Sequence, residues 1–511
     1  MCAVKAAVSE AEARFDAVRK RIGLVLAPVV FIALWFAPLD LPYEAHALAA
    51  VTGTAVVLWV TEAIPLAATA LAAPALAGLL GVASPKDALS SFGDPLMFLF
   101  IGGFMLATGL SVHGFDRRAA LWLISRKIVA GSPARAVLAV IAIGFAFSLW
   151  ISNTATTAIL LPVVLGLHTT MRTVAGDDPE TQRKMDRFGA GMCLALAYAS
   201  SLGGAATPIG TASNVIAVGM LEESIGVKID FLQWMSFALP FSIAGAVALA
   251  VIILRRFPAP VARVEGLARE VERQLAQLGR MKHAEEVAVS VFGLAIIGWL
   301  LPSLLRLALG PEHAWTVFTD DYLVEGVVAI VCASLLFFFD AGVRDADGQP
   351  RRVLEWQDAQ NMDWGTLFLL GGGLALGRLT FETGLAEAMG RGVLDVAGPL
   401  ASHPLGLTAA AALLVVGITE LTSNTATTSM MLPVVIGIAG EAGFNAAPVA
   451  VAVTLAASCA FMLPVSTPPN AMAYGTRLIR LDAMVRTGFW LDAATYVLLL
   501  LLVVGVLPLF F

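Results

Sequence analysis

The chain alternates between long apolar segments and short polar ones. Many of the apolar segments run for about 17 to 22 residues, the length that an α-helix needs to cross roughly 30 Å of hydrocarbon. Short segments of alternating hydrophobicity, typical of a membrane β-barrel, are absent. The pattern predicts an all-α polytopic membrane protein. The apolar segments lie near residues 22–38, 45–63, 66–83, 94–112, 134–151, 155–171, 187–206, 212–222, 234–254, 286–305, 322–339, 364–383, 404–421, 426–440, 446–463, 469–476 and 489–510.

Several of these segments are too short to span alone, and they occur in pairs around polar breaks. Two pairs flank a repeated hexapeptide, Ser-Asn-Thr-Ala-Thr-Thr, which begins at Ser152 and again at Ser423. Two other pairs flank residues 207–211 and 464–469, which are rich in Pro, Ser and Thr. We predict that each hexapeptide is the tip of a re-entrant hairpin, near 134–171 and 404–440, and that each later pair is one broken span. This interpretation leaves about eleven membrane crossings.

The distribution of basic residues gives the orientation. With the N-terminus in the cytoplasm, all Lys and Arg residues except Lys86, Lys228, Arg306, Arg378 and Arg391 fall on the inner side. This asymmetry follows the positive-inside rule and predicts an external C-terminus. The predicted units are a cytoplasmic N-terminal segment (1–21), a first transmembrane half (22–254), a cytoplasmic linker helix (255–285) and a second half (286–511). The linker has mixed charges, typical of a solvated helix, and a membrane-surface or regulatory role is the alternative.

Composition supports the membrane assignment. The chain is 58% hydrophobic and 14% charged, with a mean hydropathy of +0.83, whereas soluble domains are about one quarter charged. The four cysteines are scattered and predict neither a disulfide framework nor a metal cluster. The N-terminus lacks a cleavable signal pattern, so a multi-pass protein of the plasma (inner) membrane is expected. HExxH, GxSxG and Walker motifs are absent, and no nucleic-acid partner is expected. A membrane enzyme stays as an alternative that would need a catalytic dyad near the tips.

The two halves of the chain resemble each other beyond the hexapeptide. Residues 99–106 match 369–376, and the broken span at 210–214 matches that at 466–470. On the predicted topology the first hairpin enters from the cytoplasm and the second from outside, so the repeats are inverted. Inverted repeats with helices interrupted at matching positions predict a secondary transporter with a binding site near the midplane.

The residues at the breaks suit both cations and anions. N-terminal helix ends favour anions, carbonyl groups at C-terminal ends favour cations, and Ser, Thr and Asn supply oxygens for sodium and donors for a carboxylate. The same residues are also good helix N-caps, a role compatible with binding. No Lys or Arg lies in the tips or loops. The charge of a bound anion would therefore be balanced by helix N-termini and co-bound cations. This dependence couples anion binding to cation binding.

Three other features have a structural and a functional interpretation. The triple glycine 371–373 lies in an apolar segment without a following Lys, so we expect close helix packing rather than a phosphate loop. Glu62 and Glu420 lie at predicted membrane depth, where carboxylates are functional candidates. For each of the two glutamates, one interpretation is a role in coupling or gating, and the other is structural hydrogen bonding.

The motifs resemble those of one known family. The paired Ser-Asn-Thr motifs, the sequence WVTEAIP at 59–65 and STPPN at 466–470 are similar to the divalent anion/sodium symporter family, over roughly residues 20–511. The family includes sodium-coupled di- and tricarboxylate and sulfate transporters. The resemblance implies a homodimer in which each protomer has a scaffold domain and a transport domain that moves as an elevator.

The resemblance also implies two sodium sites and one substrate site. The first sodium site would use Ser148, Ser152, Asn153 and the Gly210 backbone, and the second Thr419, Ser423, Asn424 and the Ser466 backbone. Substrate carboxylates would contact Asn153, Thr154, Thr211, Asn424, Thr425, Thr467 and Pro468.

One departure from the family is visible at 210–214, which reads Gly-Thr-Ala-Ser-Asn where the family often has two prolines before the Asn. The family also contains exchangers without sodium coupling. Hydroxyls are present at Ser148 and Thr419, and no basic residue replaces a sodium ligand, which favours symport. We therefore expect sodium-coupled import of C4-dicarboxylates such as succinate, fumarate or malate. The alternatives are a sodium-independent dicarboxylate exchanger and a sulfate or tricarboxylate transporter.

Overall fold

The fold is built almost entirely from helices. The computed structural model describes residues 10–126, 132–174, 178–261, 267–344, 348–397 and 403–511. The helices of the first half are α1 (Glu10–Phe36), α2 (Tyr43–Thr61), α3 (Leu66–Leu79), α4 (Pro85–Leu89), α5 (Pro95–Val112), α6 (Phe115–Ile124), α7 (Pro133–Ser148), α8 (Asn153–Val174), α9 (Pro179–Ala205), α10 (Ala212–Ile225) and α11 (Phe231–Arg256). Those that follow are α12 (Leu267–Gln277), α13 (His283–Leu309), α14 (Ala314–Tyr322), α15 (Glu325–Phe338), α16 (Trp356–Ala359), α17 (Trp364–Glu382), α18 (Leu385–Ala397), α19 (Pro404–Thr419), α20 (Asn424–Glu441), α21 (Ala446–Ala457), α22 (Pro468–Gly475) and α23 (Leu481–Gly505).

The structure differs in detail from the predicted segments. In the described residues, one antiparallel hairpin of β1 (Asp340–Arg344) and β2 (Pro350–Arg352) departs from the all-helical pattern. Helix α1 continues from Glu10 into the first apolar segment without a break. Helix α12 covers only part of the predicted linker, and the ends of α11 and α13 overlap the two ends of that segment.

Membrane-crossing candidates are numerous. Within the described ranges, seven helical stretches are long and apolar enough to span a bilayer, and the bent pair α14–α15, with a 71° angle, would make eight. This supports a polytopic membrane protein. Helices α3, α7, α19 and α21 are apolar but shorter than the length used for that comparison. The larger count of about eleven crossings remains a prediction.

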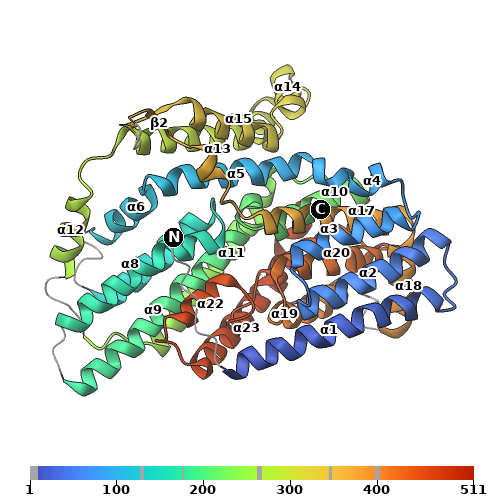
Figure 1. Ribbon diagram of the computed structural model, residues 1–511, viewed down its shortest axis with the longest axis horizontal. Helices are drawn as coiled ribbons and strands as arrows, with labels where there is room; N and C mark the ends of the chain where they lie inside the picture. Colours follow the sequence, from blue (N-terminus) through green and yellow to red (C-terminus); the bar gives the residue numbers. More distant parts are fainter. Residues whose placement is uncertain (1–9, 127–131, 175–177, 262–266, 345–347, 398–402) are drawn as a thin grey trace.

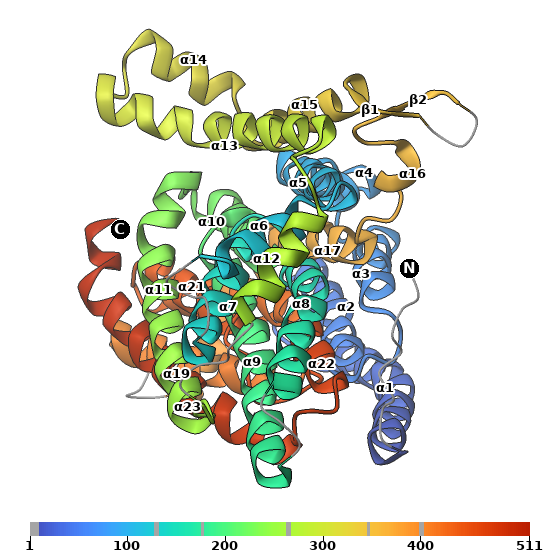
Figure 2. The same ribbon diagram turned by 90° about the vertical axis from the view of Figure 1, so that its left-hand side faces the viewer.

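The helices are arranged as a large body with a layer on one side. Figure 2 shows α13, α14, α15 and the β-hairpin together above α5, and α5 packs along α15. Figure 1 shows α8, α9 and α11 running beside α22 and α23, while α1 and α2 lie side by side at the opposite end. The two breaks that carry the hexapeptides lie between α7 and α8 and between α19 and α20.

Glycines allow the central helices to approach closely. Every residue of α9 from Phe188 to Ala205 is buried. In α17, a Cβ added at Gly372 would lie 2.2 Å from the Ala70 carbonyl oxygen of α3, and one at Gly371 would lie 2.5 Å from the Phe92 ring. The contacts agree with the packing role expected for the triple glycine, because only a residue without a Cβ permits such backbone contact.

A buried ion pair attaches the α13 end of the linker to the body. Arg118 of α6 donates to both carboxylate oxygens of Glu285 in α13, at 2.5 and 3.1 Å, and Glu285 is 2% exposed. The Arg118 guanidinium also donates to the carbonyl oxygens of Leu278, Gly279 and Arg280. One side chain therefore satisfies a carboxylate and three backbone carbonyls at this junction.

We expect Arg118→Ala to lower the free energy of unfolding by about 3–5 kcal/mol, because it leaves the Glu285 charge buried without a partner. Arg117→Ala is the matched control, since Arg117 precedes it in α6 and is exposed. The measurement is thermal unfolding of the purified protein in detergent. Equal melting temperatures for the two variants would show that the ion pair does not stabilise this junction.

Candidate functional site

Each hexapeptide forms the start of a helix. Helix α7 ends at Ser148 and α8 begins at Asn153, and likewise α19 ends at Thr419 and α20 begins at Asn424. The Ser152 hydroxyl accepts from the Ala155 N–H at 3.3 Å, and the Ser423 hydroxyl accepts from the Ala426 N–H at 3.1 Å. The serines are thus the N-caps, and capping leaves the asparagine side chains at the helix starts available for other contacts. The capping interpretation is confirmed without excluding binding.

The two asparagines make matching contacts with the preceding helices. The Ser148 hydroxyl donates to Asn153 Oδ1 at 2.6 Å, and the Thr419 Oγ1 lies 2.9 Å from Asn424 Oδ1. Thr419 Oγ1 also lies 2.7 Å from the Ala457 carbonyl oxygen. A hydroxyl has one proton and can donate to only one of these two acceptors at a time. The convergence of three oxygens is the kind of environment that a hard cation completes.

At each broken span, an asparagine side chain hydrogen-bonds backbone carbonyl groups that the break leaves unpaired. Asn214 donates through Nδ2 to the carbonyls of Gly204 and Thr207, at 3.0 and 2.8 Å. Asn470 donates in the same way to the carbonyls of Ala460 and Leu463, at 2.9 and 3.0 Å. Breaking a helix inside a membrane frees carbonyl groups that need partners, and these amides supply them. The Oδ1 atoms of both residues are buried without a hydrogen-bond partner in the described parts of the chain.

The two tips and the two loops line one cavity of about 410 Å³. Eleven of the predicted site residues line it: Ser152, Asn153, Thr154, Gly210, Thr211, Ser423, Asn424, Thr425, Ser466, Thr467 and Pro468. The remaining two, Ser148 and Thr419, lie behind the tips and reach the cavity through the asparagines they contact. The structure therefore brings the whole predicted set together.

The electrostatics of this cavity come mainly from helix ends. The first residues of α8, α10, α20 and α22 all belong to the lining or adjoin it. Helix N-termini carry a partial positive charge that favours an anion, and those of α8, α10 and α20 can also offer N–H groups, whereas α22 begins with Pro468 and Pro469, which have none. Among the described lining residues none is Lys, Arg or His. The single carboxylate, Asp363, caps α17 by accepting from the Thr366 N–H and hydroxyl, at 3.1 and 2.6 Å.

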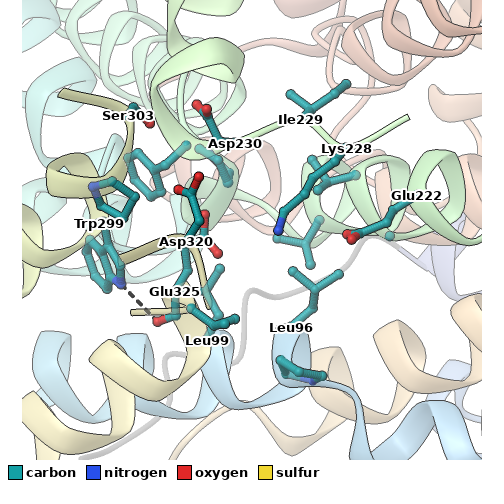
Figure 3. Close-up of a pocket in the computed structure, with 18 of the residues that line it drawn as sticks. Leu96, Leu99, Glu222, Lys228, Ile229, Asp230, Trp299, Ser303, Asp320 and Glu325 are labelled. Carbon is teal, nitrogen blue, oxygen red and sulfur yellow. Dashed lines mark hydrogen bonds between the residues drawn. The ribbon is translucent and has the colours of Figure 1, made fainter. Parts of the chain in front are cut away.

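A second cavity, of about 420 Å³, lies between the α13–α15 layer and the body, and it is acidic (Figure 3). Its lining includes Glu222, Asp230, Asp320 and Glu325, and Lys228 lies on the same side as Glu222. Arg306 donates to Asp230 at 2.8 Å and to Asp320 at 2.9 Å, so its charge is already paired. The excess of carboxylates makes this cavity unsuited to a dianion, and we place the functional site at the tips.

The two candidate carboxylates lie outside the lining of the tip cavity. Glu62 ends α2 and pairs with Arg19 at 2.8 Å, with its side chain 33% exposed. Glu420 is 3% exposed and accepts from the backbone N–H groups of Phe461, Met462 and Leu463. Both therefore make structural contacts, and those of Glu420 hold the loop before α22.

Some functional neighbours were not found from the sequence. Gly204 lies against Asn153, and Gly488, one turn before Asp492 in α23, lies against Phe461, whose N–H binds Glu420. Asp492 could have been found by the rule that identified Glu420, because it is a lone carboxylate in an apolar segment. The cavity is also lined by Phe100, Phe104 and Asp363. These residues belong to segments far from the tips in the sequence, and no local pattern marks them.

Comparison with known proteins identifies the family. Residues 18–509 match the family described as sodium:sulfate symporter transmembrane region. The chain belongs to this family of divalent anion/sodium symporters. It is therefore a membrane transporter and not an enzyme, and the alternative of a membrane enzyme is wrong.

Two curated relatives are named sodium-dependent dicarboxylate transporter SdcS. The relative from Staphylococcus aureus (strain bovine RF122 / ET3-1) is 32% identical over 492 residues, which cover 95% of this chain and 91% of the relative. The relative from Staphylococcus saprophyticus has the same identity and coverage.

Two solved transporters share the fold at low sequence identity. Neisseria gonorrhoeae MtrF has a TM-score of 0.55 and 13% identity, covering 92% of this chain and 97% of MtrF. The Alcanivorax borkumensis YdaH transporter has a TM-score of 0.52 and 14% identity, covering 80% of this chain and 85% of YdaH.

Substituting Gly204 tests whether the first tip must keep its geometry. A Cβ on this residue would lie 2.0 Å from Asn153 Oδ1, so Gly204→Ala has to displace the asparagine. We expect cation-dependent stabilisation, measured as the rise in melting temperature in sodium relative to choline chloride, to need at least about tenfold more sodium. Gly166→Ala in α8 is the control, because its Cβ would meet nothing within 4 Å. An unchanged sodium requirement in Gly204→Ala would contradict a role for Asn153 in cation binding.

Proposed function

We propose that the protein is a secondary active transporter that imports C4-dicarboxylates such as succinate, fumarate and malate together with sodium. The observation that carries the proposal is the single cavity lined by both Ser-Asn-Thr tips and both broken-span loops. Helix N-termini from both halves suit two carboxylates, and because none of the described lining residues is basic, anion binding depends on co-bound cations. Two relatives with this chemistry in their names support the same conclusion.

In this proposal each half of the chain supplies one sodium site. The ligands are those that the family resemblance implied: Ser148, Ser152, Asn153 and Gly210 in the first site, and Thr419, Ser423, Asn424 and Ser466 in the second. Substrate carboxylates contact Asn153, Thr154 and Thr211 at one end and Asn424, Thr425, Thr467 and Pro468 at the other. Matching contacts at Asn153 and Asn424, and at Asn214 and Asn470, support an inverted repeat.

We further propose an elevator mechanism in a homodimer of the plasma membrane, with the N-terminus in the cytoplasm and the C-terminus outside. The moving unit comprises α7–α11 and α19–α23, and the layer of α13–α15 belongs to the fixed scaffold. Exposed apolar side chains on α13 and α23, such as Ile297, Leu307, Leu501 and Val504, suit contact with lipid.

Two related functions use the same scaffold. A sodium-independent exchanger would require internal dicarboxylate instead of sodium, and a sulfate or tricarboxylate transporter would be inhibited by sulfate or citrate. The paired oxygens around Asn153 and Asn424 favour sodium coupling over exchange. A competition panel of dicarboxylates, citrate and sulfate separates the remaining substrates.

Uptake of succinate into proteoliposomes tests the function. We expect uptake to require an inward sodium gradient, and Asn153→Ala and Asn424→Ala each to reduce it by about tenfold to a hundredfold, since each loses a ligand to a charged group. Asn361→Ala is the control, because the side chain of this exposed asparagine hydrogen-bonds only the Gln357 carbonyl among the described residues. Uptake that is indifferent to sodium would contradict symport, and wild-type uptake by both asparagine variants would contradict the site.

Cross-linking tests the proposed motion. Arg306 of α13 contacts Asp230 at the start of α11 and Asp320 of α14, so one pair joins the two proposed units and the other lies within the scaffold. In a Cys2→Ser background, we expect a short bismaleimide to stop uptake by Asp230→Cys/Arg306→Cys and to spare Arg306→Cys/Asp320→Cys. Each variant is first measured without reagent. Continued uptake after complete cross-linking of the 230–306 pair would rule out movement of α11 against α13.

A further inference from the structure

An arginine near the start of α1 contacts the second tip. The Nη1 atom of Arg19 donates to the Leu421 carbonyl oxygen at 3.4 Å, across 402 positions of the chain. Leu421 lies between the end of α19 and the start of α20, so its carbonyl belongs to the tip itself. Helices α19 and α20 belong to the unit that we propose to move, whereas α1 lies outside it. The contact therefore joins the moving unit to the rest of the protein.

Two carboxylates hold the Arg19 guanidinium in place. Its Nη2 atom lies 2.8 Å from Glu62 Oε2 and 3.3 Å from Asp16 Oδ1. Glu62 follows the last residue of α2, so this ion pair also joins α1 to α2. Because the carboxylates balance the charge of Arg19, the arginine can contact the tip without placing a net positive charge beside the proposed second sodium site.

The carbonyl of Leu421 is well placed to accept from a cation. The last carbonyls of a helix have no partner within the helix, and the C-terminal end carries a partial negative charge. Helix α19 ends at Thr419, and the Leu421 N–H continues its last turn by donating to the Ile418 carbonyl at 2.9 Å. Arg19 brings both a donor and a positive charge to this end, and its contact favours the tip in its present place.

The backbone at Glu62 holds its side chain toward α1 at a cost. Glu62 has a φ of 48°, a left-handed conformation that residues with a Cβ disfavour and that glycine adopts freely. One turn after Arg19, a Cβ added at Gly23 would lie 2.0 Å from Thr61 Oγ1, so α1 touches the end of α2 on the same face. A strained position that keeps a carboxylate where glycine would fit more easily indicates that the carboxylate has a use.

We propose that Arg19 is a positioning residue which, oriented by Glu62, docks the second tip onto α1 and α2 and releases it during transport. This inference rests on the proposed function for its transport consequences. With the N-terminus in the cytoplasm, Arg19 lies at the cytoplasmic end of the first apolar segment, so the docked tip is near the cytoplasmic side. The contact then favours the inward-facing state over the outward-facing one. An ion pair that only stabilises the fold is the opposing possibility, and it would favour neither state.

Substitution of Arg19 separates the two possibilities in uptake by intact cells. Loss of docking raises the fraction of protein whose site faces outside, so we expect Arg19→Ala to lower the external succinate concentration for half-maximal uptake by about twofold to fivefold. Glu62→Gly relieves the backbone strain and removes the carboxylate, so it should melt no lower than the wild type and shift half-maximal uptake in the same direction. Arg21→Ala is the matched control, because Arg21 is an exposed base in the same helix.

The docked arrangement is also measurable without transport. In the Cys2→Ser background, the Asp230→Cys/Arg306→Cys pair reports how the body lies against α13. We expect a short bismaleimide to cross-link this pair more slowly when Arg19→Ala is added, and at an unchanged rate when Arg21→Ala is added.

Unchanged half-maximal uptake and unchanged cross-linking in Arg19→Ala would overturn the proposal. A higher succinate requirement with a lower melting temperature would also overturn it, because it would make the ion pair a contact that only stabilises the fold. Slower cross-linking in Arg19→Ala, in a protein whose uptake proves indifferent to sodium, would support the docking role and contradict only the proposed function.

Discussion

Interrupting a helix inside an apolar environment is the constraint on which this site depends. Each interruption frees backbone N–H and C=O groups that the surrounding hydrocarbon cannot satisfy. In the broken spans the carbonyls are bound by Asn214 and Asn470, and the amides before α22 are bound by Glu420. Because side chains satisfy these backbone groups, the interruptions can lie inside the apolar body beside the cavity. In the proposed function, the polar residues of the breaks therefore serve stability and binding together.

The preference for charge that we propose for the cavity would come from the same arrangement. Helix N-termini from both halves converge on it, while hydroxyl and amide oxygens gather behind the tips at Ser148 and Thr419. A fixed Lys or Arg would hold an anion without help and would oppose a cation nearby. Because the described lining has no such residue, the charge of a bound dianion has to be compensated by what binds beside it. Family membership and the named relatives are consistent with this dependence.

Much of the site could be predicted from the sequence because the chain repeats it. One Ser-Asn-Thr motif is an ordinary helix cap, but two copies followed by two broken spans indicate that four segments meet, and eleven of the thirteen predicted residues line one cavity. The contacts of Gly488 and Gly204 could not be predicted, because they depend on how α23 and α9 pack against their neighbours. The β-hairpin was missed because its sequence lacks strong periodicity, whereas α12 lies within the linker helix predicted at 255–285.

The dependence of anion binding on sodium is the central claim, and the affinity of the purified protein for succinate at a series of sodium concentrations tests it most directly. Thermodynamic linkage requires that, if a bound cation increases the affinity for the anion, the bound anion increases the affinity for the cation by the same factor. We predict that the succinate concentration for half-saturation falls steadily as sodium replaces choline, and that the apparent sodium affinity rises with succinate. Equal succinate affinity in sodium and in choline would contradict the claim.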